Sequence, residues 1–364
     1  MERRLWRRFD YILLLDTLAL VGLGIIAIAS ATLGVPGEDL VKRQIIFATV
    51  GLVVMLIAAV VDYRLLGGNL GFFLYPALIV ILAAVVAFGR VMGGSRGWFD
   101  LGSFFVQPAE LGKILVILVL ARFLSRYEAR LGRFPYLVVA LGLLIPPVAL
   151  IYLQPDLGGA AIVLVIGLAL IWLGGMRWRH IIILTVVVGI LAPTIWASLQ
   201  PYMRTRILVF INSETNPDVS YDVEQALISI GSGGLIGQGL GHGSQSQLHF
   251  VRVRHTDFVF SVIAEELGFI GTMGLLLLLL LLLMRLLRIA DLARDTFGRL
   301  IACGVALVIF VQTFVNIGMN LRLLPATGIT LPFISYGGSS LVTLMLGLGL
   351  AQSVAMRHKK LEFQ

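Results

Sequence analysis

A carboxylate that precedes a long apolar run is the first candidate for chemistry. Asp257 stands just before that run, and Ser261 and Glu265 follow it at intervals of four residues. On a helix this spacing places all three on one face. Three residues shortly before Asp257 are basic or carry a ring nitrogen: Arg252, Arg254 and His255. A carboxylate beside such groups is a candidate site for proton transfer, although Asp at this place can instead cap a helix.

A second candidate is an acidic and a basic residue in an otherwise apolar segment. Glu110 and Lys113 lie three residues apart within Gln107–Lys113, so a helix places them on one face. Ionisable groups at membrane depth are costly and suggest function by default. Two interpretations stay open, a structural ion pair and a role in ligand binding. Asp156, in contrast, lies in the tight turn Gln154–Gly158, where we expect it to cap the next helix.

Zinc and disulfide chemistry have little support in the sequence. His242, His249 and His255 lie near one another, but a structural zinc site requires four close ligands and this segment has no cysteine. The chain's single cysteine, Cys303, falls inside an apolar run. Neither a disulfide nor a thiolate cluster can therefore form within one chain. We predict no zinc site and assign no metal-ligand set.

The elements that must position these residues are membrane-spanning helices. Of 364 residues, 59% are hydrophobic and 13% are charged, with a mean hydropathy of +0.97. A soluble domain is only about 45–50% apolar and about 25% charged. A spanning helix requires about 20 mostly apolar residues, and such stretches follow one another here. We predict an all-α, polytopic membrane protein with about ten transmembrane helices: Tyr11–Ser30, Gln44–Val61, Gly71–Phe88, Pro108–Leu124, Pro135–Leu153, Leu157–Leu173, Ile181–Ser198, Phe258–Met284, Leu300–Leu321 and Ser339–Met356.

Basic residues beside these spans determine the orientation, because Lys and Arg are retained on the cytoplasmic side. We interpret the basic start of the chain as a cytoplasmic anchor, since no signal-peptide cleavage site follows the first apolar run. An even number of spans then places both the N-terminus and the C-terminus in the cytoplasm. The residues kept inside are Arg122, Arg126, Arg130, Arg133, Arg177, Arg179, Arg285, Arg288, Arg294, Arg299, Arg357, Lys359 and Lys360. Because they are dispersed at helix ends, the net charge of +8 reflects topology and predicts no nucleic-acid partner.

One long segment interrupts the pattern of short connections. We treat residues 1–364 as a single membrane domain in which residues 199–256 form a long extracytoplasmic loop before the eighth span. Connections of this length are usually functional or disordered. Because this one contains signals of local order, we expect it to be functional.

Two features of this loop suggest local structure. Ser220 or Asp222 can cap a short interfacial helix that ends at Gly231. Glycines then alternate with other residues from Gly237 to Gly243. This alternation indicates either a flexible loop or a close approach of the backbone to a ligand.

Five motifs in the same order along the chain resemble those of the SEDS proteins (shape, elongation, division and sporulation). The motifs are Gly94–Trp98 running through to Gln107–Lys113, Gln154–Gly158, Gly243–Gln245, Thr256–Gly268 and Leu331–Ser340. The resemblance covers nearly the whole chain. Within the family, the compact N-terminus, whose basic stretch runs straight into Asp10, favours a RodA-like over an FtsW-like member.

This resemblance implies a peptidoglycan glycosyltransferase that polymerises lipid II at the outer face of the bacterial plasma (inner) membrane, for cell elongation and shape. Lipid II would be both donor and acceptor. The implied partners are a class B penicillin-binding protein, the elongation machinery and membrane lipids. The alternative is a lipid II flippase of the same pathway, a role that was once proposed for the family.

The resemblance also implies roles for individual residues. Asp257 occupies the family position of the base that accepts a proton from the attacking sugar hydroxyl. The departing pyrophosphate requires cationic groups, to which we assign the outer basic residues Lys113, Arg206 and Arg96. Further candidates for substrate binding are Glu110, Trp98, Gln245 and Ser261. The sequence leaves open whether a divalent cation, Mg²⁺ or Mn²⁺, bridges phosphate oxygens and Asp257.

Overall fold

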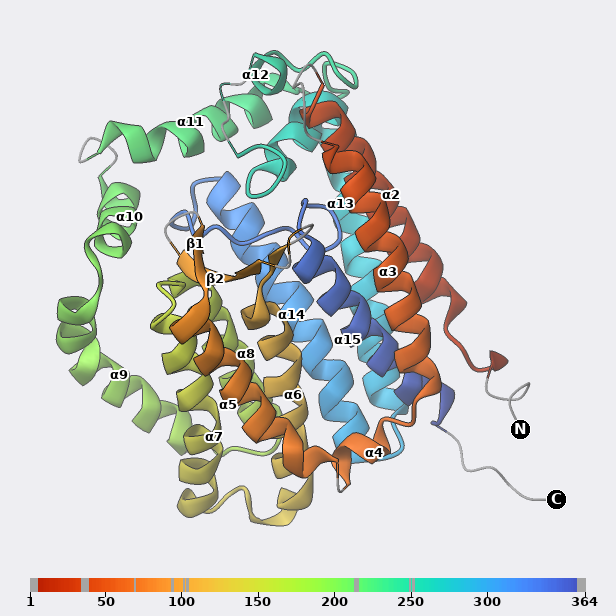
Figure 1. Ribbon diagram of the computed structural model, residues 1–364, viewed down its shortest axis with the longest axis vertical. Helices are drawn as coiled ribbons and strands as arrows, with labels where there is room; N and C mark the ends of the chain where they lie inside the picture. Colours follow the sequence, from red (N-terminus) through yellow and green to blue (C-terminus); the bar gives the residue numbers. More distant parts are fainter. Residues whose placement is uncertain are drawn as a thin grey trace.

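The computed structural model describes residues 6–33, 39–68, 70–92, 95–100, 102, 105–212, 216–248, 250 and 253–358. These residues form a helical bundle with one small antiparallel sheet (Figure 1). The helices are α2 (Tyr11–Ala31), α3 (Leu40–Val60), α4 (Arg64–Gly67), α5 (Gly71–Phe88), α6 (Pro108–Arg126), α7 (Phe134–Tyr152), α8 (Leu157–Leu173), α9 (Trp178–Ser198), α10 (Pro201–Ile211), α11 (Pro217–Ser232), α12 (Ser244–Gln247), α13 (Val259–Leu292), α14 (Thr296–Asn320) and α15 (Gly338–Met356). The described strands are β1 (Arg90–Met92), β2 (Ser95–Asp100) and β3 (Phe105–Val106).

The predicted all-α, multi-pass membrane fold is confirmed, but the count of ten spans is not. Each predicted span falls on a helix. Among the described residues, seven helices are long and apolar enough to cross a membrane, and eight if the two halves of α9, which are bent by 47°, count as one span. The remaining two differ for physical reasons: α8 has only 17 residues, and α6 carries Glu110, Lys113 and Arg122.

The centre of the bundle explains how α6 can carry charges. Helix α6 packs against α5, α8, α14 and α15, so its sides contact protein and not lipid. Ile114 of α6 and Val305 of α14 converge on Gly347 of α15, where an added Cβ would lie 3.0 Å and 3.3 Å from their side-chain carbons. Small residues let helices approach closely in membranes. The core formed in this way holds α6 rigidly beneath the sheet.

Both ends of the described chain meet at one end of the bundle. The amide of Asp10, before α2, donates to Gln352 Oε1 of α15 at 3.0 Å, and Gln352 Nε2 donates to Asp10 O at 2.8 Å. Arg285 of α13 pairs with the Asp10 carboxylate at 2.6 Å. The sheet, α11 and α12 lie at the opposite end (Figure 1). This arrangement agrees with termini that share one side of the membrane.

Three helices occupy the described part of the predicted long loop, residues 199–256: α10, α11 and α12. The expected helix start at Ser220 or Asp222 is wrong, because α11 begins at Pro217. Proline suits the first helical turn, where its missing amide hydrogen has no intrahelical acceptor. The helix ends at Ser232, one residue beyond the expected Gly231. His249 and Arg252 lie outside the described residues.

A break in α13 explains the alternating glycines. Gly268 adopts φ 66° and ψ −164° inside the helix. The broken turn gains main-chain hydrogen bonds from the glycine-rich segment: Phe269 N to Gly234 O (2.9 Å), Ile270 N to Leu235 O (3.1 Å), Gln238 N to Glu265 O (3.0 Å) and Gly239 N to Glu266 O (3.0 Å). Gly237, at φ 79°, faces Gly268 so closely that a Cβ on either would clash with the other backbone. The sequence left open a flexible loop or a close approach to a ligand, whereas the close approach that the structure shows is to α13.

Candidate active site

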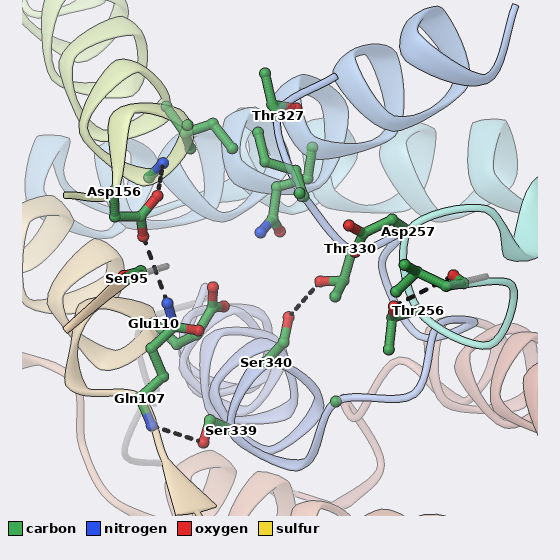
Figure 2. A pocket seen from close by; sticks show the side chains of 18 of the residues that line it. Ser95, Gln107, Glu110, Asp156, Thr256, Asp257, Thr327, Thr330, Ser339 and Ser340 are labelled. Atoms are coloured by element: carbon green, nitrogen blue, oxygen red, sulfur yellow. Dashed lines mark hydrogen bonds between the residues drawn. The ribbon is translucent and has the colours of Figure 1, made fainter. Parts of the chain in front are cut away.

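A cavity of about 550 Å³ lies at the end of the bundle that carries the sheet and α10. Its volume falls within the range of small-molecule sites, roughly 300–1,000 Å³. The walls come from β2, α6, α10, the turn before α8, the segment before α13 and the segment between α14 and α15. Figure 2 labels residues from these walls except those of α10. Five residues predicted for the site line it: Trp98, Glu110, Lys113, Arg206 and Asp257.

Asp257 lies in the segment just before α13, with its side chain partly exposed. It does not cap α13, because the N-cap residue is Phe258 and no side chain makes a cap hydrogen bond there. Desolvation raises the pKa of the Asp257 carboxyl to about 6, while the positive charge of Arg206 acts in the opposite direction. A group whose pKa is raised to this range can take and release a proton near neutral pH.

Arg206 of α10 supplies the cation beside that carboxylate. Its Nη1 donates to Ala326 O at 3.3 Å, and its guanidinium lies 5.7 Å from the centre of the Tyr202 ring. Gly328, at φ 73°, packs between the two charged groups. A Cβ at this position would lie 3.6 Å from Asp257 Oδ2 and 3.8 Å from Arg206 Nη1. A negative and a positive group therefore face the same part of the cavity.

Glu110 and Lys113 form the predicted pair on α6. Lys113 Nζ lies 2.6 Å from Glu110 Oε1, and the side chains are 4% and 13% exposed, respectively. Both residues also line the cavity. The ion pair and the ligand role, which the sequence left as alternatives, are therefore compatible in one structure. A buried ammonium held by a single carboxylate keeps donors that an anionic ligand can accept.

Asp156 confirms its predicted role as a helix cap and also lines the cavity. Its Oδ1 accepts a hydrogen bond from Gly159 N at 2.7 Å, at the start of α8. Its Oδ2 accepts from Gln107 Nε2 at 3.4 Å, as Figure 2 shows. Burial raises the pKa of this carboxyl, and the Gly159 hydrogen bond and Lys113 act against that rise. The cavity thus holds a third acidic group that the sequence suggested only as a cap.

Three predicted binding residues are not brought to the cavity. Arg96 is exposed, Gln245 lies on α12 and Ser261 is fully buried in α13. The Ser261 hydroxyl donates to Phe258 O at 2.7 Å, and the main-chain N–H of Gln245 donates to Glu265 Oε1 at 2.7 Å. These contacts stabilise the fold around the site.

The basic stretch before Asp257 divides in the same way. His255 lines the cavity, whereas Arg254 is buried and its Nε donates to Ala31 O.

Other cavity residues were not predicted. The segment between α14 and α15 contributes Thr330, and the first turn of α15 contributes Ser339 and Ser340. The Thr330 hydroxyl lies 3.2 Å from Ser340 Oγ (Figure 2). Their position within or next to the Leu331–Ser340 motif is the sequence feature that could have suggested them. Arg43, near the start of α3, also lines the cavity. The sequence feature that could have suggested Arg43 is its place as a basic residue at the predicted outer end of the second span.

The described residues hold no group of three or more His, Cys, Asp or Glu side chains that could bind a metal ion on their own. Asp257 nevertheless presents a carboxylate to the cavity, a group that can serve as one oxygen ligand. Mg²⁺ commonly binds to one or two carboxylates and completes its shell with substrate phosphates and water. The chemistry of the donor set therefore fits a cation that arrives with a phosphate-bearing substrate.

Comparison with known proteins identifies the family of this chain. A family model described as cell cycle protein (FtsW, RodA and SpoVE) matches residues 10–360. The chain is 42% identical to the peptidoglycan glycosyltransferase MrdB of Escherichia coli (strain K12), over 97% of this chain and 95% of that protein. It is 34% identical to the probable peptidoglycan glycosyltransferase FtsW of Geobacter metallireducens, over 97% and 96%.

Solved structures show the same likeness. The rod shape determining protein RodA of Thermus thermophilus superposes with a TM-score of 0.73 at 35% identity, covering 97% of this chain and 98% of that one. A chain from a structure on the coordination of polymerization and crosslinking by a peptidoglycan synthase complex gives a TM-score of 0.83 at 35% identity, over 96% and 98%. Both the matched length and the identity show that this chain belongs to the FtsW, RodA and SpoVE family of cell cycle proteins.

Proposed function

We propose that this chain is a peptidoglycan glycosyltransferase that joins lipid II units into glycan strands at the outer face of the bacterial plasma membrane. The observation that carries the proposal is a carboxylate of raised pKa, Asp257, facing the same cavity as the cations Arg206 and Lys113. The relatives named as peptidoglycan glycosyltransferases support the reaction class.

The reaction requires a base and a site for a leaving pyrophosphate. A sugar hydroxyl attacks an anomeric carbon, a new glycosidic bond forms, and the bond to undecaprenyl pyrophosphate breaks. Asp257 accepts the hydroxyl proton. Its pKa of about 6 allows the carboxylate to be ionised at neutral pH and still take up a proton. Arg206 and Lys113 stabilise the charge that develops on the leaving group. Arg suits bidentate contact with phosphate, whereas Lys acts as a point charge.

A divalent cation, Mg²⁺ or Mn²⁺, belongs to this proposal. It would be held by the Asp257 carboxylate together with pyrophosphate oxygens and would neutralise part of the phosphate charge. The chain's own cations remain necessary in this scheme, because Arg206 and Lys113 orient the same group from the other walls of the cavity.

A class B penicillin-binding protein is the proposed partner, acting in the machinery for cell elongation and shape. The support is the likeness to a chain from a peptidoglycan synthase complex in which polymerization and crosslinking are coordinated. Membrane lipids surround the spans, and the undecaprenyl chain of the substrate lies among them. We propose no nucleic-acid partner.

The test is polymerisation of purified lipid II by the full chain in detergent, with its penicillin-binding partner present. Detergent has no second compartment, so transport alone produces no product. We expect glycan polymer from the wild type and a loss on the order of 10²–10⁴-fold from Asp257→Asn, which removes the base and keeps the size.

The design also tests the flippase alternative. Transfer of lipid II across vesicle bilayers with no polymer under any partner condition would support a transporter. An Asp257→Asn protein within a few-fold of the wild-type rate, at matched amounts of folded protein, would remove Asp257 from the mechanism.

A further inference from the structure

The main-chain carbonyl of Asp257 lies outside the hydrogen-bond ladder of α13. In a helix it would accept from the amide of Ser261, but that amide donates to Phe258 O at 3.1 Å. Two side chains of α14 take this place: Asn316 Nδ2 donates to Asp257 O at 2.9 Å and Asn320 Nδ2 donates to it at 3.1 Å. Both asparagines are completely buried. Their spacing of four residues places them on one face of the helix.

Asn316 also holds the opposite wall of the cavity. Its Nδ2 donates to Ile329 O at 2.7 Å. A primary amide has two donor hydrogens, so these two bonds use both of them. Ile329 follows Gly328, the residue that packs against the Asp257 carboxylate and the Arg206 guanidinium. One buried side chain thus joins the segment that carries the carboxylate to the segment that contacts both charged groups.

The carbonyls of His255 and Thr256 are held by residues distant in the chain, and the carbonyl of Phe258 is held by a side chain of α13 itself. Their donors are Tyr336 N to His255 O (2.9 Å), Ser335 Oγ to Thr256 O (2.5 Å) and Ser261 Oγ to Phe258 O (2.7 Å). Every carbonyl from residue 255 to 258 therefore accepts a hydrogen bond. The backbone beneath the carboxylate cannot shift without breaking at least one of these contacts.

The alternative role for the two asparagines is structural. A buried carbonyl needs a donor, and any donor would satisfy it. On that view the loss of an asparagine weakens the whole fold equally. The bridge between Asp257 and Ile329 predicts a local effect instead, because it ends at the two segments that face each other across the carboxylate.

We infer that Asn316, assisted by Asn320, is a positioning residue that holds the Asp257 carboxylate in register with the loop at residues 325–330 and with Arg206. The catalytic meaning of this role rests on the proposed function. The positioning itself can be measured without any activity, because it determines how accessible the carboxylate is.

The experiment measures the reactivity of two cavity carboxylates in the full chain purified in detergent. A carbodiimide and an amine label carboxyl groups, and mass spectrometry gives the labelling rates of Asp257 and Asp156 in one sample. In Asn316→Ala we expect the Asp257 rate to rise about threefold or more, with the Asp156 rate unchanged. Asp156 is the internal control because its own hydrogen-bond partners, Gly159 and Gln107, make no hydrogen bond to Asn316 in the described part of the chain.

Two further variants make the result decisive. Asn320→Ala keeps the Asn316 bridge and should give a smaller rise at Asp257, and it serves if Asn316→Ala does not fold. Thr313→Val, on the same helix, removes a hydroxyl for which the described residues provide no hydrogen-bond partner, and it should leave both labelling rates unchanged. Equal rises at Asp257 and Asp156, or no rise at either, would overturn the inference in favour of the structural role.

Activity is measured on the same preparations. If the wild type makes polymer, Asn316→Ala should lower the rate per folded molecule by about tenfold or more, because misplacement of a reacting group is costly. A wild type that makes no polymer, combined with selective labelling of Asp257, would reject the proposed function and retain the positioning role. The two failures are therefore distinguishable.

Discussion

Asp257 owes its environment to segments that are far apart in the chain. Arg206 reaches it from α10, Gly328 packs against it, and Asn316 holds its carbonyl from α14. Each contact changes a different property: charge, exposure and position. The ion pair of Glu110 and Lys113 adds a second charged group on another wall. The charge, exposure and position of these side chains therefore depend on residues that are distant in the sequence.

The rate of polymerisation should depend on the protonation of Asp257. A base must be ionised, and desolvation raises the pKa of this carboxyl from 3.8 to about 6. The rate should therefore rise with pH between about 5 and about 7 and be lost as the pH falls through the raised pKa. Because Arg206 lowers this pKa, Arg206→Gln should move the midpoint of the pH–rate profile upward. A wild-type profile that is flat over this interval would contradict the assignment.

Lys113 should matter more than Glu110 for turnover. Lys113→Met removes a cation from the cavity and should lower the rate on the order of 10²-fold, as for the loss of a group that stabilises transition-state charge. Glu110→Gln keeps a hydrogen-bond acceptor for the ammonium and should cost about tenfold or less. Rates are compared per folded molecule, since breaking a buried pair also destabilises the fold. A Lys113→Met protein with the wild-type rate would reduce the pair to a structural role.

At the scale of elements, the break in α13 connects the loop of residues 199–256 to the helical bundle. Glu265 and Glu266 precede the break and extend the connection with their side chains. Glu265 accepts from Ser246 N at 3.0 Å, and Glu266 accepts from Ser30 Oγ at 2.5 Å and from Gly241 N at 3.2 Å. The loop that contains α12 is thus attached to both α13 and α2. Asp257 lies in the segment that joins this loop to α13.

Replacement of the glycine at the break should therefore destabilise the protein. Gly268→Ala places a Cβ 2.2 Å from Gly237 N and at a positive φ of 66°. The backbone conformation alone costs about 1–3 kcal/mol for a residue other than glycine, and the clash adds to it. The measurement is the thermal midpoint of the purified protein in detergent. Gly274→Ala on the same helix is the matched control, because a Cβ there meets nothing within 4 Å; equal midpoints for the two variants would contradict the role of the break.

At the scale of the whole molecule, the cavity lies at one end of the bundle and the chain's described termini meet at the other. The cavity is lined by the sheet, α10 and the segments before α13 and α15. The contacts of Asp10 with Gln352 and Arg285 lie at the other end. This polarity places the proposed chemistry on one side of the membrane only.

Labelling in intact cells tests this orientation. In a Cys303→Ser background, Lys42→Cys at the start of α3 should react with a membrane-impermeant maleimide, and Glu128→Cys between α6 and α7 should not. Both side chains are accessible on the protein surface, with exposures of 74% and 52%, so only the membrane should decide the difference. Labelling after cell lysis is the control for reactivity. Reaction of Glu128→Cys in intact cells would reverse the predicted topology.

The sequence by itself determined the class of the fold, because apolar runs of spanning length leave no soluble alternative and basic residues mark one side. It also identified Asp156 as a cap, since a local turn depends on neighbouring residues alone. Only the tertiary structure decided which residues face the cavity. Spacing places Asp257, Ser261 and Glu265 on one helical face, but Asp257 precedes the helix and Glu265 turns to α12. Periodicity relates residues within one helix, whereas the neighbour that each face meets depends on packing between helices.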